Sequence, residues 1–122
     1  MTYKYLHYKE NEKDKIGIVS LNRPEKKNAL SGGLMKELAN ILNTIADENK
    51  VSVVIIKGMG KIFSAGYDLT EVYEYDPQEK INLFRTCFMM MRAIREMPKA
   101  VIAQVHGIAT AAGCQLVMNP DQ

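Results

Sequence analysis

Two nearly continuous apolar stretches constrain the fold more than any other feature of this chain. Residues 53–56 read Val-Val-Ile-Ile, and residues 100–105 read Ala-Val-Ile-Ala-Gln-Val. Strands buried on both faces of a parallel sheet carry such β-branched runs, whereas a strand with one solvated face alternates apolar and polar residues. We therefore expect strands at Val51–Lys57 and Ala100–Val105, each buried on both faces, in an α/β domain.

Shorter patterns predict the elements around these two strands. Tyr3–Lys9 and Ile16–Leu21 are predicted strands of a hairpin, because a charged turn separates them. Ser31 is predicted to cap a helix that ends near Asp47, since the apolar residues between them keep helical spacing. A brief helix is expected over Asp68–Tyr73.

A long helix is the strongest local prediction. Asp76-Pro77-Gln78-Glu79 places an acceptor at the N-cap, proline at the first helical position and glutamate at the third, which is a capping-box arrangement. The helix is expected to stop before Pro98 and to pack through one face. That predicted face consists of Ile81, Phe84, Phe88, Met91 and Ile94, and the methionines at 89, 90, 91 and 97 are expected to be packing residues.

With a final helix expected over 111–118, the element order is ββα-βα-α-βα. This order is typical of an α/β domain with crossover connections. At 122 residues, the chain accommodates a single domain over 1–122.

Composition excludes several classes of partner. The net charge of +2 is small and the basic residues are scattered, so nucleic acid is not an expected partner. No apolar run reaches the roughly 18 residues of a membrane span. Cys87 and Cys114 are expected to be reduced, half-buried thiols, and His7 and His106 are isolated, so no metal site is predicted. The early residues lack an apolar signal stretch and carry acidic side chains, which favours a cytoplasmic location, with a mitochondrial one as the open alternative.

Two segments share a plan that could carry chemistry: a buried strand, a turn of small residues, and then a helix. The turns are Phe63–Asp68 and Gly107–Cys114. Small residues allow close approach to the backbone, and a helix start leaves N–H groups unpaired. Two such donors on one oxygen would form an oxyanion hole, where one donor is worth about 3 kcal/mol in the transition state. Tight packing alone is the alternative interpretation. Neither turn matches a dinucleotide fingerprint, a P-loop or a nucleophile elbow.

Three motifs in order resemble the crotonase superfamily, the enoyl-CoA hydratase/isomerase family. They are Leu21–Ser31, Lys61–Leu69 and Pro98–Leu116, and over Ala109–Val117 one branch of the superfamily is most similar. The resemblance implies the N-terminal part of the crotonase (ClpP/crotonase-like) ββα spiral fold. Because the sequence departs from the family at Met118–Gln122, we expect a truncated or split form that lacks the C-terminal helical region.

The resemblance also implies a substrate and its site. The substrate would be an acyl-CoA thioester, with coenzyme A as part of the substrate and no separate cofactor. The backbone N–H groups of Tyr67 and Ala112 match the family's oxyanion-hole donors. The positions that would line the CoA and thioester channel are Ala29, Leu30, Ser64, Ala65, Gly66, Tyr67, Asp68, Leu69 and Ala112. The family forms trimers or hexamers through C-terminal helices that this sequence does not contain.

One departure bears on catalysis. Family hydratases carry glutamate where this chain has Gln115, and an amide cannot act as a general acid or base near neutral pH. The second family glutamate would lie beyond Gln122, and Asp68 and Glu71 are expected to serve the first turn of a helix.

We therefore expect acyl-CoA chemistry of the hydratase/isomerase type in fatty-acid and acyl-CoA metabolism, with enolate stabilisation but without hydratase activity as the chain stands. The alternatives are a non-catalytic acyl-CoA-binding or interaction protein and an inactive truncated fragment.

Overall fold

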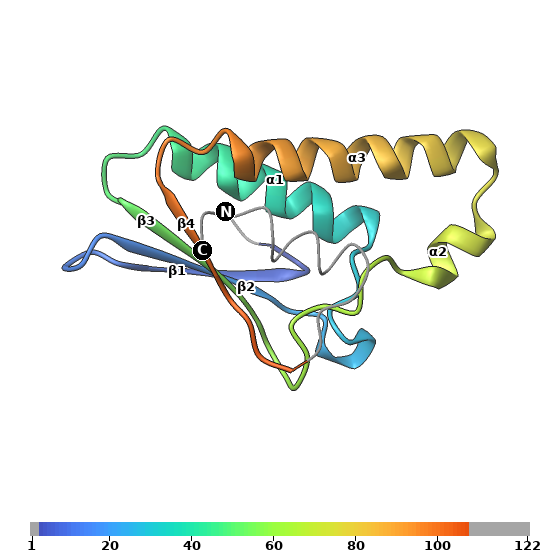
Figure 1. Ribbon diagram of the computed structural model, residues 1–122, viewed down its shortest axis with the longest axis horizontal. Helices are drawn as coiled ribbons and strands as arrows, with labels where there is room; N and C mark the ends of the chain where they lie inside the picture. The colour runs from blue at the N-terminus through green and yellow to red at the C-terminus, as the bar shows by residue number, and fades with distance from the viewer. Residues whose placement is uncertain (1–2, 108–122) are drawn as a thin grey trace.

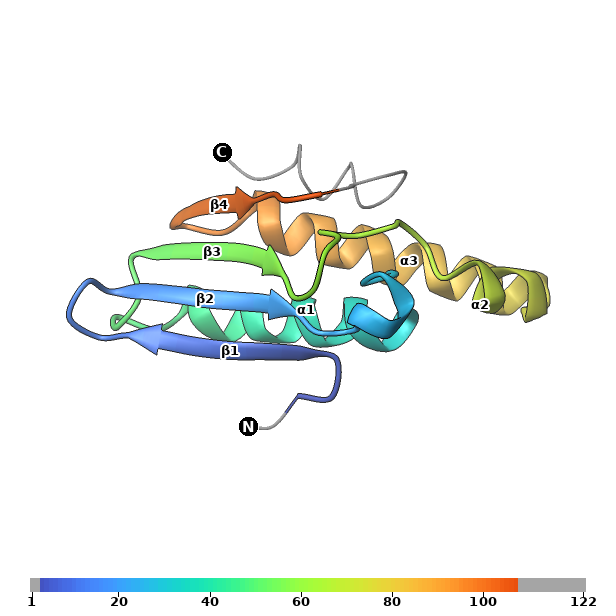
Figure 2. The same cartoon turned by 90° about the horizontal axis from the view of Figure 1, so that it is seen from below.

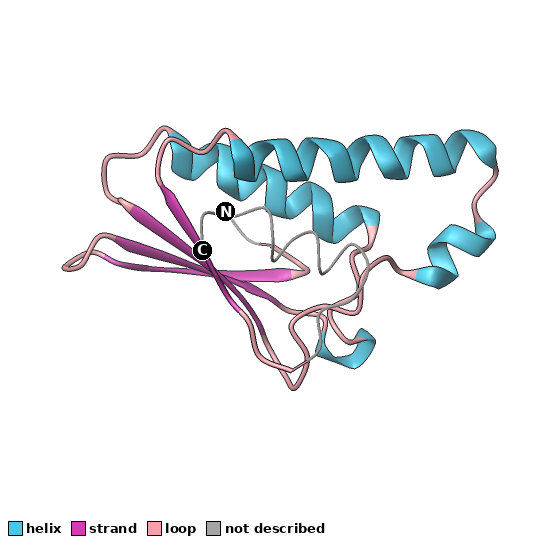
Figure 3. Ribbon diagram, in the orientation of Figure 1, coloured by secondary structure: helices cyan, strands magenta, loops and turns pink. Residues whose placement is uncertain are grey.

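A computed structural model of the chain describes residues 3–107, which form a four-stranded sheet with helices (Figures 1 and 3). The elements in chain order are β1 (Leu6–Asn11), β2 (Ile16–Leu21), the 3₁₀ turn η1 (Pro24–Lys26), α1 (Gly32–Ala46), β3 (Val53–Gly58), α2 (Leu69–Glu74), α3 (Pro77–Arg95) and β4 (Ala100–Gln104). The predicted α/β class and element order are confirmed as far as Gly107. The helix predicted over 111–118 lies outside the described residues.

The sheet combines an antiparallel hairpin with parallel strands. Its order is β1-β2-β3-β4, in which β1 pairs with β2 antiparallel, while β2, β3 and β4 run parallel. The hairpin is confirmed, but its first strand begins at Leu6 and not at Tyr3. Since three parallel strands end at the same edge, the loops after Leu21, Gly58 and Gln104 gather there (Figure 2).

Helices α1 and α3 lie side by side on one face of the sheet (Figures 1 and 2). The exposure of β3 alternates accordingly: Val54 and Ile56 are fully buried, whereas Val53 and Ile55 are only half-buried. The prediction that this strand is buried on both faces is therefore wrong within the described part of the chain. Helices cover one side of the sheet there, and apolar side chains remain partly exposed on the other.

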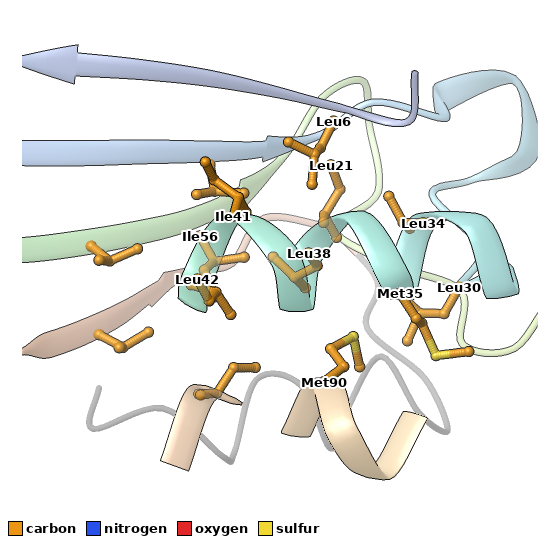
Figure 4. Close-up of a cluster of buried hydrophobic side chains, with 14 of the residues drawn as sticks. Leu6, Leu21, Leu30, Leu34, Met35, Leu38, Ile41, Leu42, Ile56 and Met90 are labelled. Carbon is orange, nitrogen blue, oxygen red and sulfur yellow. The ribbon is translucent and has the colours of Figure 1, made fainter. Parts of the chain in front are cut away.

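The core forms where α1 meets the sheet and α3 (Figure 4). The Ser31 side chain accepts a hydrogen bond from the Leu34 N–H, which confirms the predicted cap. The completely buried side chains of α1 are Leu34, Met35, Leu38, Leu42 and Ile45. They contact Leu6, Leu21 and Ile56 of the sheet and Met90 of α3 within one cluster.

Helix α3 confirms its predicted start and corrects its predicted face. Asp76 and Glu79 form the reciprocal capping box. The buried side chains, however, are Leu83, Cys87, Met90 and Ile94. Three residues of the predicted face are largely exposed, at 51% for Ile81, 48% for Phe84 and 58% for Phe88. Of the four methionines, Met90 is buried, Met91 and Met97 pack against the core, and Met89 is exposed. The face of α3 that packs on the core is thus rotated about the helix axis from the predicted face.

No helix within residues 3–107 is long and apolar enough to cross a lipid bilayer.

Candidate functional site

The candidate site lies at the edge of the sheet where β2, β3 and β4 end. Three loops meet there, over residues 22–31, 59–68 and 105–107. Ligands of open α/β sheets generally bind outside the carboxyl ends of parallel strands, so this edge is the expected ligand-binding region.

Asn28 fastens two of these loops together. Its side chain is fully buried; Nδ2 donates to the carbonyl oxygens of Met59 and Ile62, both at 2.8 Å, and Oδ1 accepts from the Arg23 N–H at 2.8 Å. The residue has φ of 53°, a left-handed conformation that asparagine tolerates better than most residues. Sequence reasoning did not single out Asn28, because its carbonyl partners lie more than thirty residues away.

Ser64 holds the following turn from inside. Its hydroxyl is fully buried, donates to the Asn28 carbonyl at 2.9 Å and accepts from the Gly66 N–H at 3.2 Å. The Ala65 N–H donates to the Lys27 carbonyl at 3.0 Å. The small residues of this turn therefore allow the backbone of 64–66 to pack closely against the loop that ends at Leu30.

Tyr67 has a backbone N–H that points away from the β-bridge formed by this residue. It forms a parallel β-bridge with Leu30, in which the Leu30 N–H donates to the Gly66 carbonyl at 2.7 Å and the Asp68 N–H donates to the Leu30 carbonyl at 3.4 Å. A trans peptide points its N–H opposite to its carbonyl, so the Tyr67 N–H points away from Leu30. Within residues 3–107 this N–H has no hydrogen-bond acceptor.

The reason for this free donor differs from the predicted one. The sequence predicts unpaired donors in this segment because a helix start leaves N–H groups unpaired. Helix α2 instead begins at Leu69 with Asp68 as its N-cap, so Tyr67 precedes the helix in extended backbone. The β-bridge, and not α2, directs the donor.

The acidic side chains beside Tyr67 already have partners. Asp68 Oδ2 pairs with Arg23 Nη2 at 3.1 Å, and Asp68 Oδ1 accepts from the Glu71 N–H at 3.4 Å. Glu71 Oε1 accepts at 2.8 Å from the N–H of Gly32, the first residue of α1. Asp68 therefore serves the first turn of α2, as expected, whereas Glu71 binds the start of α1.

Arg23 completes this network and was also missed by sequence reasoning. It donates to the Ala29 carbonyl at 2.9 Å, and its guanidinium lies 5.5 Å from the Tyr5 ring centroid. Because both members of the Arg23–Asp68 pair are mostly buried, we assign the pair to holding the loops and not to proton transfer.

The end of β4 meets the loop that leads to Tyr67. The Phe63 N–H donates to the His106 carbonyl at 3.1 Å, and His106 Nε2 lies 2.6 Å from the Gly60 carbonyl oxygen. Gly107 has φ of 65°, and a Cβ there would lie 2.1 Å from the Lys61 carbonyl oxygen. The second small-residue segment, which begins at Gly107, therefore starts in contact with the loop that leads into the first one.

The predicted channel positions divide by exposure. Leu30, Ser64 and Gly66 are buried and Ala29 nearly so; Ala65, Tyr67 and Asp68 are half-buried, and Leu69 is exposed. Ala112 and Gln115 lie outside the described residues, as does Cys114, whereas Cys87 is free and buried.

A cavity of about 340 Å³ lies beside this loop cluster. Its lining combines Pro24, Met59, Gly60 and Ile62 with two lysines, Lys27 and Lys61. Neither lysine is in an ion pair with another residue of 3–107. In that range there is also no group of three or more His, Cys, Asp or Glu side chains that could hold a metal ion.

Comparison with known proteins gives consistent matches. A model of the enoyl-CoA hydratase/isomerase family matches residues 11–122. Enoyl-CoA hydratase domain-containing protein 3, mitochondrial, from Homo sapiens is 42% identical over 109 residues, covering 88% of this chain and 36% of that protein. Enoyl-CoA hydratase domain-containing protein 3 is the branch of the superfamily that Ala109–Val117 resembles. The 2,3-dehydroadipyl-CoA hydratase of Escherichia coli (strain K12) is 33% identical over 111 residues, covering 91% of this chain and 43% of that protein.

Solved structures agree with the sequence matches. The crystal structure of human enoyl coenzyme A hydratase domain-containing protein 3 superimposes with a TM-score of 0.90 at 38% identity, covering 97% of this chain and 46% of that one. An enoyl-CoA hydratase of Mycobacterium smegmatis gives a TM-score of 0.91 at 40% identity, with the same coverage of 97% and 46%. The chain therefore spans less than half the length of each of these relatives.

Proposed function

The chain belongs to the enoyl-CoA hydratase/isomerase family, and we propose that it binds an acyl-CoA thioester and stabilises negative charge on the thioester oxygen. The chemistry proposed is that of fatty-acid and acyl-CoA metabolism. The free N–H of Tyr67 is the observation that carries this proposal.

A thioester carbonyl becomes an enolate oxygen when a proton leaves the α-carbon. A fixed donor that already points at this oxygen stabilises the developing charge without reorganising, and removing one such donor costs about 3 kcal/mol. The Tyr67 N–H fits this role because its peptide is held by the Leu30–Gly66 hydrogen bond of 2.7 Å. The Ala112 N–H is the second donor in this proposal, as the family resemblance implies.

The cavity between Lys27 and Lys61 is proposed to receive the coenzyme A end of the substrate. Coenzyme A carries phosphates, and unpaired ammonium groups attract anions into a cleft. The apolar wall from Pro24, Met59 and Ile62 offers a surface for an uncharged part of the same molecule. The two lysines would then contribute equally to binding of free coenzyme A and of a thioester.

Proton transfer is assigned to none of the described carboxylates near the donor. Asp68 and Glu71 are occupied by Arg23 and by helix starts. Position 115 carries an amide, which cannot act as a general acid or base near neutral pH. These observations favour a second candidate, acyl-CoA binding without turnover, and the same site serves both functions.

Calorimetric titration with free coenzyme A, crotonyl-CoA and 3-oxobutanoyl-CoA tests the proposal. The 3-oxo thioester forms an enolate readily, so we expect it to bind most tightly and free coenzyme A most weakly. Lys27→Gln and Lys61→Gln should weaken all three ligands by the same factor. Equal affinity for the three ligands, or no binding at all, would overturn the proposed site.

A further inference from the structure

The side chain of Tyr67 leaves the loop and contacts α3. Its hydroxyl donates to Cys87 Sγ at 3.3 Å, and its ring meets Phe84 edge-to-face at 5.6 Å between centroids, with an interplanar angle of 82°. From the sequence, Tyr67 is assigned a specific role only through its backbone N–H. The structure gives this side chain two specific contacts on another element.

The hydroxyl bond lies at a desolvated end of the side chain. Cys87 is 5% exposed and belongs to the core-facing stripe of α3. Burial, and next the bond to Cys87, raises the pKa of Tyr67 above its ordinary value near 10. Loss of this partner would leave the hydroxyl without its hydrogen bond inside the protein, so the thiol fixes where the ring can settle.

This contact acts on the backbone donor because the two share a residue. The carbonyl of the 66–67 peptide is held by Leu30, while the Cα of Tyr67 is held through its side chain by α3. Gly66, with φ of 90°, precedes this peptide, and its own N–H is held by the Ser64 hydroxyl. The contacts with α3 add a restraint on the Cα side of the peptide that carries the Tyr67 N–H, beside the bridge to Leu30 on its carbonyl side.

We propose that Cys87 and Phe84 are positioning residues that hold the Tyr67 N–H on the thioester oxygen by anchoring the Tyr67 side chain to α3. The inference rests on the proposed function, which it deepens by naming what orients the donor. Cys87 acts as a hydrogen-bond acceptor here, and Phe84 limits the tilt of the ring.

Four substitutions separate anchoring from packing. Tyr67→Phe keeps the ring and removes the hydroxyl, and Cys87→Ala removes the acceptor. Cys87→Ser supplies another acceptor at nearly the same place. Met89→Leu is the matched control, since Met89 is exposed on the same helix and has no contact with Tyr67.

Two readouts report on the ligand itself. The first is the infrared stretch of the C1 carbonyl of bound, isotope-labelled crotonyl-CoA, which falls as the carbonyl is polarised. The second is the enolate fraction of bound 3-oxobutanoyl-CoA, whose α-proton passes to the buffer while the charge settles on oxygen. Melting temperatures are recorded in parallel, since a purely structural contact changes those alone.

The wild-type chain should show a lowered carbonyl stretch, and Tyr67→Phe and Cys87→Ala should each reverse part of it. A neutral hydrogen bond contributes about 0.5–1.5 kcal/mol, so the enolate equilibrium should fall by about two- to tenfold. The double variant should lose no more than either single one, because both remove the same bond. Cys87→Ser should restore the wild-type spectrum, and Met89→Leu should leave it unchanged.

The outcomes also separate this inference from the proposed function. A wild-type spectrum without any carbonyl shift overturns the proposed function and the inference with it. A normal wild-type shift that all variants retain overturns the inference alone, even when their melting temperatures fall. Additive losses in the double variant would mean that the two side chains act independently, which also contradicts anchoring.

Discussion

Replacing Asn28 by alanine should destabilise the folded chain more than most single substitutions. The change removes three side-chain hydrogen bonds, each 2.8 Å long, to Arg23, Met59 and Ile62. At about 1 kcal/mol net for each bond, the loss is about 3 kcal/mol. Alanine also lacks the short polar side chain that makes left-handed backbone at φ of 53° tolerable for asparagine, which adds about 1 kcal/mol. The expected total is therefore about 4 kcal/mol, against a typical domain stability of about 5–15 kcal/mol.

Urea unfolding followed by circular dichroism measures this loss, at one fixed protein concentration so that any association stays comparable. With a slope near 2 kcal/mol per molar urea, the midpoint should fall by about 2 M. Asn28→Gly removes the same bonds without the backbone strain, so it should cost about 1 kcal/mol less than alanine. Asn43→Ala, on the exposed side of α1, should change stability by no more than about 0.5 kcal/mol. A loss below about 1 kcal/mol for both Asn28 variants would refute the assignment of Asn28 as the residue that fastens these loops.

Four further outcomes are expected. Gly107→Ala should destabilise by about 2 kcal/mol or more, because its Cβ would lie 2.1 Å from the Lys61 carbonyl oxygen, whereas Gly32→Ala, with its nearest atom at 3.6 Å, should be tolerated in the same unfolding assay. Because the folded protein raises the pKa of Tyr67, this residue contributes stability at pH values below its ordinary pKa near 10, and that stability should be lost as pH rises through the raised pKa. Tyr67→Phe should therefore lose less unfolding free energy at alkaline pH than the wild-type chain, as measured by pH-dependent unfolding. The chain should self-associate in sedimentation, driven by exposed side chains such as Phe84 and Phe88, and a monomer with a sharp cooperative melt would contradict this. Hydration of crotonyl-CoA, followed by loss of the enoyl absorbance, should be negligible and stay so in Gln115→Glu, because general acid–base groups typically supply about 10²–10⁴-fold.

Local chemistry made parts of the fold predictable. The caps at Ser31 and Asp76 depend on residues within three positions of each other, so the sequence displays them directly. The hairpin and the parallel strands follow in the same way from short apolar runs bounded by polar turns. These elements were predicted with errors of a few residues at their ends.

The buried face of α3 could not be predicted, because the helix carries two apolar stripes. Leu83, Cys87, Met90 and Ile94 follow helical spacing as well as the predicted set that begins at Ile81. Periodicity cannot choose between two such stripes, and the larger side chains gave the wrong answer. Contact with α1 makes the choice, and that contact joins residues far apart in the sequence.

In the candidate site, too, local features were predictable and long-range contacts were not. The small residues of 64–66 predicted a close backbone approach, and the free N–H of Tyr67 was expected at that position. Its cause was not visible, because the bridge to Leu30 joins residues 37 positions apart. Asn28 and Arg23 were missed because the bonds that join the loops are distant in sequence, and a polar loop carries no periodic signal. These bonds run from Asn28 to Met59 and Ile62 and from Arg23 to Asp68.

The charges around Tyr67 suggest which task this part of the chain can perform. Asp68, the acidic side chain next to the donor, is neutralised by Arg23, while Lys27 and Lys61 keep their charges free of ion pairs within residues 3–107. A fixed N–H with uncompensated cations nearby favours an oxygen that gains negative charge. Asp68 and Glu71, the carboxylates beside the donor, are already engaged by Arg23 and by N–H groups at helix starts, so neither is placed to transfer a proton as a general acid. In the proposed function, polarisation of the substrate and transfer of its proton are therefore separable tasks, and residues 3–107 would perform the first.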